Sequence, residues 1–187
     1  MIIRDENIQV TENFNMKELY SNSFNAPAEH FLDDRVIQAL QYIRSASGVP
    51  IRVTSTYRTL AHNTLIGGAK KSQHMVGKAI DFQFVNNNAQ ELKRLHTLMK
   101  DEDGPLRRAL WDLGVRGFGY YQTFAHIDVR DRDRWVTWND SSAMIDQDGV
   151  TAYLYDVSVP LLKRYRIPLA TIGILGVGGY LYYKNKK

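Results

Sequence analysis

The segment Ala79–Phe84 has the alternation of a β-strand, yet it carries a carboxylate among large apolar residues. Side chains alternate between the two faces of a strand, so Ile80, Phe82 and Phe84 share one face and Asp81 points to the other. A carboxylate in so apolar a strand needs a cation or hydrogen-bond donors. The chain must therefore fold so that partners for Asp81 converge on one face of a sheet.

Two histidines and a second aspartate are spaced to supply such partners. His74 precedes Asp81 by seven residues, in a loop where Gly77 permits a tight turn back over the strand. His126 belongs to a second alternating segment, and Asp128 shares its face. Two imidazoles and one carboxylate with an open fourth position are the ligand set of a catalytic zinc site. A structural network of His–Asp hydrogen bonds is the alternative.

The pattern of helices and strands predicts an α+β fold, a small antiparallel sheet with flanking helices. Hydrophobic spacing and end signals predict helices over residues 33–45, 89–100 and 106–113, with a shorter helical turn over 14–20. Alternation predicts strands over 51–55 and 79–84 and a hairpin made of 117–121 and 124–129. Residues 56–78 are expected to form a loop.

Composition narrows the chemistry further. The absence of cysteine excludes a disulfide framework, a zinc finger, an iron–sulfur site and a thiol nucleophile, so a metal must be held by His, Asp or Glu. The remaining histidines, His30, His62 and His96, lack a spaced partner and are expected to pack or to lie at the surface. Six of the 24 basic residues and none of the 20 acidic ones lie in 163–187, so the body is near neutral. No nucleic-acid partner is expected.

The C-terminal end has the composition of a membrane segment. Residues 167–183 carry no charge, at the short end of the roughly 17–25 residues that a membrane-spanning helix needs. Basic residues flank this segment and tyrosines end it, as at a bilayer interface. A stripe of small residues would admit a second helix. We expect a single-pass C-terminal anchor in a lipid bilayer, with a glycine-rich terminal strand or core helix as the alternative.

Three sequence blocks together resemble a known family. They are Ser55-Thr-Tyr-Arg58, then Ser72-x-His74-x-x-Gly77-x-Ala79-x-Asp81, and last Phe124-Ala-His126-Ile-Asp128-Val-Arg130. These blocks, in this order, resemble the zinc D-Ala-D-Ala carboxypeptidases and murein endopeptidases with the Hedgehog-like fold. The resemblance extends from about Phe14 to Trp135.

The resemblance implies roles for individual residues. His74, Asp81 and His126 match the three ligands of Zn²⁺. Arg58 matches an arginine near the substrate carbonyl or its developing oxyanion, and Ser72 matches a substrate or outer-shell contact. For Tyr57 and Tyr121 we expect either a place along the substrate groove or a packing role.

One position departs from the family pattern. Several relatives place a catalytic carboxylate three residues before the last histidine, where this chain has Thr123, which cannot act as a base. Asp128 resembles the family branch that has His-x-Asp. It is the candidate general base, or else a carboxylate that orients the metal-binding histidine.

The resemblance, together with the composition of the C-terminal end, implies a domain organisation and a function. We expect a zinc peptidase domain at 1–138, a connecting segment at 139–166, a transmembrane helix at 167–183 and a basic tail at 184–187. The expected activity is zinc-dependent hydrolysis of peptidoglycan stem or cross-link peptides by a membrane-anchored enzyme, in a virion membrane for bacteriophage entry or in lysis. Virion proteins or another helix are expected as further partners. The alternative is an inactive zinc-stabilised module that binds peptidoglycan or serves virion structure.

Overall fold

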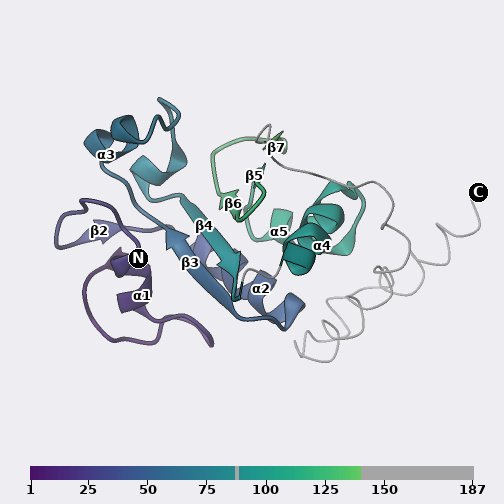
Figure 1. Ribbon diagram of the computed structural model, residues 1–187, viewed down its shortest axis with the longest axis horizontal. Helices are drawn as coiled ribbons and strands as arrows, with labels where there is room; N and C mark the ends of the chain where they lie inside the picture. The colour runs from purple at the N-terminus through teal and green to yellow at the C-terminus, as the bar shows by residue number, and fades with distance from the viewer. Residues whose placement is uncertain (87–88, 140–187) are drawn as a thin grey trace, which may run out of the picture.

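The fold is built on a mixed five-stranded sheet. The computed structural model describes residues 1–86 and 89–139 (Figure 1). The sheet has the order β3-β4-β6-β5-β7. Its strands are β3 (Ile51–Ser55), β4 (Ala79–Phe84), β5 (Gly117–Tyr120), β6 (Ala125–Asp128) and β7 (Val136–Asn139). The predicted strands and the hairpin are confirmed, and β7 was not predicted.

The expectation of a purely antiparallel sheet is wrong at one pair. β5 and β7 are parallel, whereas the other neighbours are antiparallel. β6 ends at Asp128 opposite Gly117, the first residue of β5, and β7 begins at Val136 opposite the same glycine. The short connection therefore passes around the start of β5 to its free edge, and β7 runs in the direction of β5.

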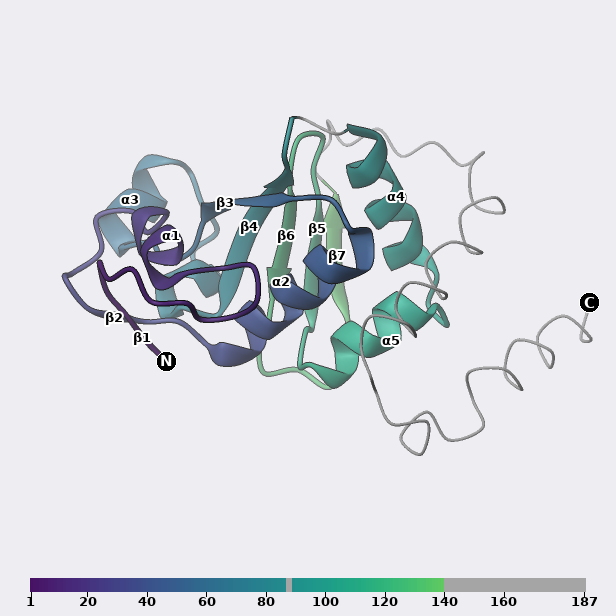
Figure 2. The same cartoon turned by 90° about the horizontal axis from the view of Figure 1, so that it is seen from below.

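Helices pack against the apolar face of this sheet (Figure 2). They are α2 (Asp34–Ser47), α4 (Ala89–Lys100) and α5 (Pro105–Asp112). The core face of the strands carries Ile80, Phe82 and Phe84, all buried, as the alternation predicted. Asp81 and His126 pair directly across β4 and β6 on the opposite face. The sheet thus separates the hydrophobic core from the polar face that holds the site.

Local sequence features set the ends of these helices. The Asp33 carboxylate caps α2 by accepting from the backbone N–H of Arg35 at 3.0 Å. Gly48 ends the helix in the left-handed conformation, with φ of 70°. Pro105 opens α5 at a position whose N–H has no helical partner, so α5 begins one residue earlier than predicted.

Residues 56–78 are not a simple loop, and this expectation is wrong. They contain α3 (Leu60–Leu65) and a one-turn 3₁₀ helix, η1 (Gln73–Val76). The Thr59 side chain caps α3, and Gly77 closes η1 with a left-handed φ of 65°. Elements this short are held by caps and tertiary contacts rather than by a hydrophobic period, which is why the sequence pattern did not disclose them.

The N-terminal part braces the segment that carries His74. It contains β1 (Ile2–Ile3), α1 (Met16–Ser21) and β2 (His30–Phe31), and β1 pairs with β2. Gly77 lies so close to the Phe31 carbonyl that a Cβ there would overlap it, and the Asp33 N–H donates to the Gly77 carbonyl at 2.8 Å. A glycine is therefore required where η1 meets this layer.

Within residues 1–86 and 89–139, no helix combines the length and apolarity needed to cross a bilayer. The segment 167–183, predicted to be a transmembrane helix, lies outside the described residues, as do 184–187 and nearly all of 139–166.

Candidate metal centre

Three buried side chains from separate segments converge on the polar face of the sheet. His126 Nδ1 lies 2.7 Å from Asp81 Oδ1, and His74 Nε2 lies 3.1 Å from the same oxygen. The two imidazole nitrogens are 3.2 Å apart. In the part of the chain that the structure describes, this is the one group of three His, Cys, Asp or Glu residues whose ligand atoms all lie within 4.8 Å of one another.

The sequence explains how each ligand reaches this point. Asp81 and His126 face each other because β4 and β6 pair antiparallel in that register. His74 comes from η1, which Gly77 turns back toward β4, as predicted. The convergence of the three residues is therefore confirmed, and β4 supplies the central ligand.

The outer nitrogen of each imidazole is held by a hydrogen bond, so its inner nitrogen is directed at the other ligands and offers a lone pair to a metal once it has lost its proton. His74 Nδ1 donates to the Thr56 carbonyl at 2.5 Å, since a carbonyl oxygen only accepts. His126 Nε2 donates to Asp128 Oδ2 at 3.0 Å. His74 Nε2, His126 Nδ1 and a carboxylate oxygen then point at one another. Two imidazole nitrogens and one carboxylate oxygen in this arrangement fit Zn²⁺ and leave a fourth position for water or substrate.

Burial and close charges perturb the pKa values of this group. Burial raises the pKa of Asp81, but the neighbouring His74 and His126 outweigh it and hold that pKa well below its usual value. Burial lowers the pKa of His74, which favours the neutral ligand form. Burial also lowers the pKa of His126, but hydrogen bonds to Asp128 and Asp81 outweigh burial and raise that pKa. A divalent cation bound between the ligands would replace the imidazole protons that now face Asp81.

Arg58 lies against the same cluster. Its guanidinium donates to Asp81 Oδ2 and, through Nε, to Ser55 Oγ at 2.8 Å. One oxygen of Asp81 therefore faces the two histidines, and the other is held by the arginine. The Arg58 side chain retains 14% of its exposure, so the guanidinium is at the edge of the site.

Asp128 occupies the far side of His126 from the other two ligands. It is fully buried, and Arg130 binds both of its oxygens, with Nε 2.7 Å from Oδ1 and Nη2 2.5 Å from Oδ2. Burial raises the pKa of Asp128, but the hydrogen bonds from Arg130 and His126 outweigh it and lower the pKa to about 2. The carboxylate is thus ionised and directed at the outer nitrogen of the ligand.

The other predicted site residues have different surroundings. Ser72 is half-buried and immediately precedes η1, whose first turn it does not cap. The Tyr57 ring packs 5.1 Å from the buried His30, and Tyr121 stacks at 4.1 Å on Phe124. Thr123 is exposed in the turn between β5 and β6. Substrate contacts by these residues stay predictions.

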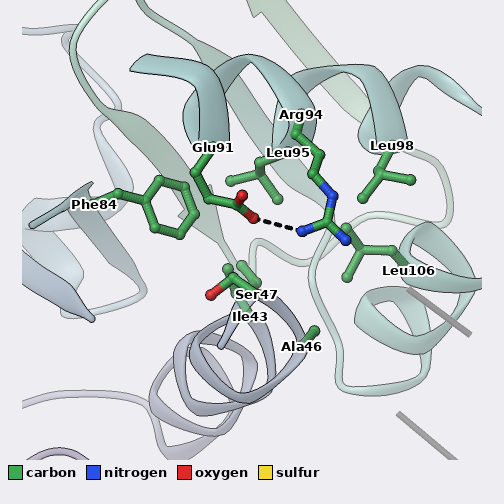
Figure 3. Close-up of a pocket in the computed structure, with 9 residues that line it drawn as sticks. All are labelled: Ile43, Ala46, Ser47, Phe84, Glu91, Arg94, Leu95, Leu98 and Leu106. Atoms are coloured by element: carbon green, nitrogen blue, oxygen red, sulfur yellow. Dashed lines mark hydrogen bonds and ion pairs between the residues drawn. The ribbon is translucent and has the colours of Figure 1, made fainter. Parts of the chain in front are cut away.

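The remaining histidines pack away from the cluster, as predicted. His30 and His96 are buried, and His62 stacks at 4.6 Å on Phe24. A pocket between α2 and α4 lies next to Phe84, on the core side of the sheet (Figure 3). Asp81 faces the other side of the sheet. The Glu91–Arg94 ion pair, with a 2.8 Å contact, lines this pocket. The pocket therefore belongs to the helical layer and not to the metal centre.

Trp138 is a neighbour of the metal centre that no sequence pattern predicted. Its indole lies 5.0 Å from the His126 ring, and its Nε1 donates to the Tyr121 hydroxyl at 2.9 Å. β7, which carries it, was not predicted, so no spacing pointed to this residue. Glycines occupy every second position of β5, at Gly117 and Gly119. They are the local sequence signal that bulky side chains lie over this face of the strand.

The fold and the donor set define an α+β domain with a mononuclear His–Asp–His metal centre. The profile of the Peptidase M15 family matches residues 10–128, more than half of the chain, and includes all three ligands and Arg58. The chain belongs to the Peptidase M15 family and is a zinc metallopeptidase of that family. A search of curated proteins found no match.

Proposed function

We propose that this protein hydrolyses peptide bonds in the stem or cross-link peptides of peptidoglycan. The observation that carries the proposal is the convergence of His74 Nε2, Asp81 Oδ1 and His126 Nδ1, with each outer imidazole nitrogen already bound. Membership of the M15 family supplies the substrate class.

The residues around the ligands have separable tasks. When bound, zinc polarises an amide carbonyl and lowers the pKa of a water ligand towards ~7. Arg58 lies at the edge of the site beside Asp81, and its positive charge would stabilise a substrate carbonyl oxygen as that oxygen becomes negative. Arg130 holds both oxygens of Asp128, and one of these oxygens also accepts from His126 Nε2. Asp128 would therefore keep His126 in the tautomer whose Nδ1 has a free lone pair for the metal. Its place behind His126 favours this orienting role over that of general base.

The test is hydrolysis of defined muropeptides by the full-length chain, followed by mass spectrometry of the products. We expect cleavage that stops on treatment with a chelator and returns with added Zn²⁺. His74→Ala should abolish the activity, whereas His62→Ala, at a histidine outside the cluster, should retain it. Intact substrate after incubation with a folded, zinc-loaded protein would contradict the proposal.

That negative result would favour a second function, a zinc-stabilised module that binds peptidoglycan without cleaving it. Thr123 at the position of the relatives' carboxylate supports this alternative, as does the place of Asp128 behind His126. Retention of the zinc-loaded protein on insoluble peptidoglycan, with no released peptide, is the expected result for such a module.

Membrane anchoring is a separate proposal that rests on sequence alone. The uncharged residues 167–183 and their basic flanks support attachment of the peptidase to a bilayer, in a virion membrane for bacteriophage entry or in lysis. The full chain should float with lipid vesicles in a density gradient. Leu175→Asp should stop flotation, and the matched control Leu65→Asp, at a side chain on α3 that is 82% exposed, should not. Flotation of Leu175→Asp with the vesicles would contradict this proposal.

A further inference from the structure

Two glycines of β5 clear the space behind the metal-binding histidine. Gly117 pairs with Asp128 and Gly119 with His126 in the β5–β6 register. A Cβ at Gly117 would lie less than 3.0 Å from the carboxylate of Asp128. A Cβ at Gly119 would lie 2.8 Å from Trp138 Nε1. The site face of β5 is therefore bare so that a carboxylate and an indole can lie directly upon it.

Trp138 fills the second of these spaces. The parallel strand β7 places it opposite Gly119, beside the His126 ring, with 5.0 Å between ring centroids and an interplanar angle of 59°. Its Nε1 donates to the Tyr121 hydroxyl at 2.9 Å, and this bond fixes the orientation of the indole. The Trp138 side chain is half-buried.

Trp138 also contacts the group that holds Asp128. The Arg130 guanidinium carbon lies 5.2 Å from the centre of the indole, within the range of a cation–π interaction. Arg130 in turn binds both oxygens of Asp128, which accepts from His126 Nε2. The indole is thus in contact with the first and the last members of the series His126–Asp128–Arg130.

We propose that Trp138 is a positioning residue of the metal centre, which fixes the plane of the His126 ring and shields the His126–Asp128–Arg130 hydrogen bonds from water. This inference rests on the zinc binding that the proposed function requires, and not on hydrolysis itself. Hydrogen bonds between charged groups are stronger where water is excluded, and the partners of a metal-binding histidine set its tautomer and direction. Both effects act on Nδ1, the atom that faces Asp81 and His74. The family match ends at residue 128, so it does not include this tryptophan.

The test measures zinc affinity of the full-length chain by competition with a chromophoric chelator, without substrate. Trp138→Ala should raise the zinc Kd by about 10- to 100-fold, the range found when outer partners of metal ligands are removed. Trp138→Phe keeps a ring beside His126 but loses the bond to Tyr121, so its Kd should lie between those of Trp138→Ala and the parent. Tyr121→Phe should resemble Trp138→Phe.

Trp135→Ala is the matched control, because Trp135 is also half-buried and contacts an arginine, Arg107, at 5.0 Å, away from the metal centre. Its zinc Kd should stay within about twofold of the parent. An unchanged Kd in Trp138→Ala, or an equal rise in Trp135→Ala, would overturn the inference. Should Trp138→Ala fail to fold, Trp138→Phe and Tyr121→Phe decide it by the same measurement. Since no hydrolysis is measured, an inactive protein with normal zinc binding would refute the proposed function and leave this inference standing.

Discussion

Gly117→Ala should destabilise the protein only while Asp128 is present. The new Cβ would lie less than 3.0 Å from Cγ and both oxygens of that carboxylate, and these are its three nearest atoms. To restore van der Waals contact the carboxylate must retreat by about 1 Å. Such a shift pulls it away from His126 Nε2 and from the guanidinium of Arg130.

The size of the effect follows from the bonds that are lost. A hydrogen bond to a charged group contributes about 1.5–3 kcal/mol, so loss of two of them lowers the free energy of unfolding by about 3–6 kcal/mol. Asp128→Ala removes the same bonds and should cost a similar amount. In the double variant the clash no longer exists, and Gly117→Ala should add less than about 1 kcal/mol to the cost of Asp128→Ala alone.

Urea unfolding of the zinc-free chain, followed by circular dichroism, gives the four free energies of this double-mutant cycle. Gly119→Ala provides the control, because its Cβ would meet Trp138 and Tyr121 instead of Asp128. The cost of Gly119→Ala should therefore persist when Asp128 is replaced by Ala. If the effects of Gly117→Ala and Asp128→Ala simply add, the proposed steric relation between β5 and the carboxylate is wrong.

Two further predictions concern stability. His96 is buried, and burial lowers its pKa from 6.5 to about 4. The unfolded chain therefore binds a proton at this histidine below about pH 6.5, whereas the folded chain binds it only below about pH 4. His96 should contribute about 3 kcal/mol to the fall in the free energy of unfolding as the pH drops across this window. His96→Met, but not His62→Met, should reduce that fall in urea titrations, and an unchanged profile would contradict this prediction. Gly77→Ala should cost more than about 3 kcal/mol in urea unfolding, because its Cβ would overlap the Phe31 carbonyl in addition to the strain of a φ of 65°. Gly67→Ala has a similar φ and no atom within 4 Å, so it should cost only about 1–2 kcal/mol, and equal costs at the two glycines would disprove the overlap.

The sequence alone predicted most of the elements and the identity of the metal ligands. Alternation in a strand has a period of two residues, so Asp81 had to face away from Phe82, and Asp128 had to share a face with His126. These are local consequences of backbone geometry. They needed no knowledge of the rest of the fold, and the structure confirms them.

Short elements and the edge strand could not be predicted from sequence patterns. α3 and η1 each span few residues and depend on Thr59 and Gly77 for their ends, so they have no hydrophobic period that would predict them. β7 could be recognised only in the structure, where it pairs with β5. Its four residues would not form a stable strand outside the sheet.

The sequence by itself determined which side chains could bind a metal, because residue type and strand alternation fix the donor atoms and the face on which they lie. Only the tertiary structure decided what each donor does. It assigned Nε2 to His74 and Nδ1 to His126, set Asp128 behind the ligand and brought Trp138 beside it. The physical reason is that the direction of a lone pair depends on the hydrogen-bond partner of the opposite nitrogen. That partner is fixed by strand register and by the packing of segments distant in the chain.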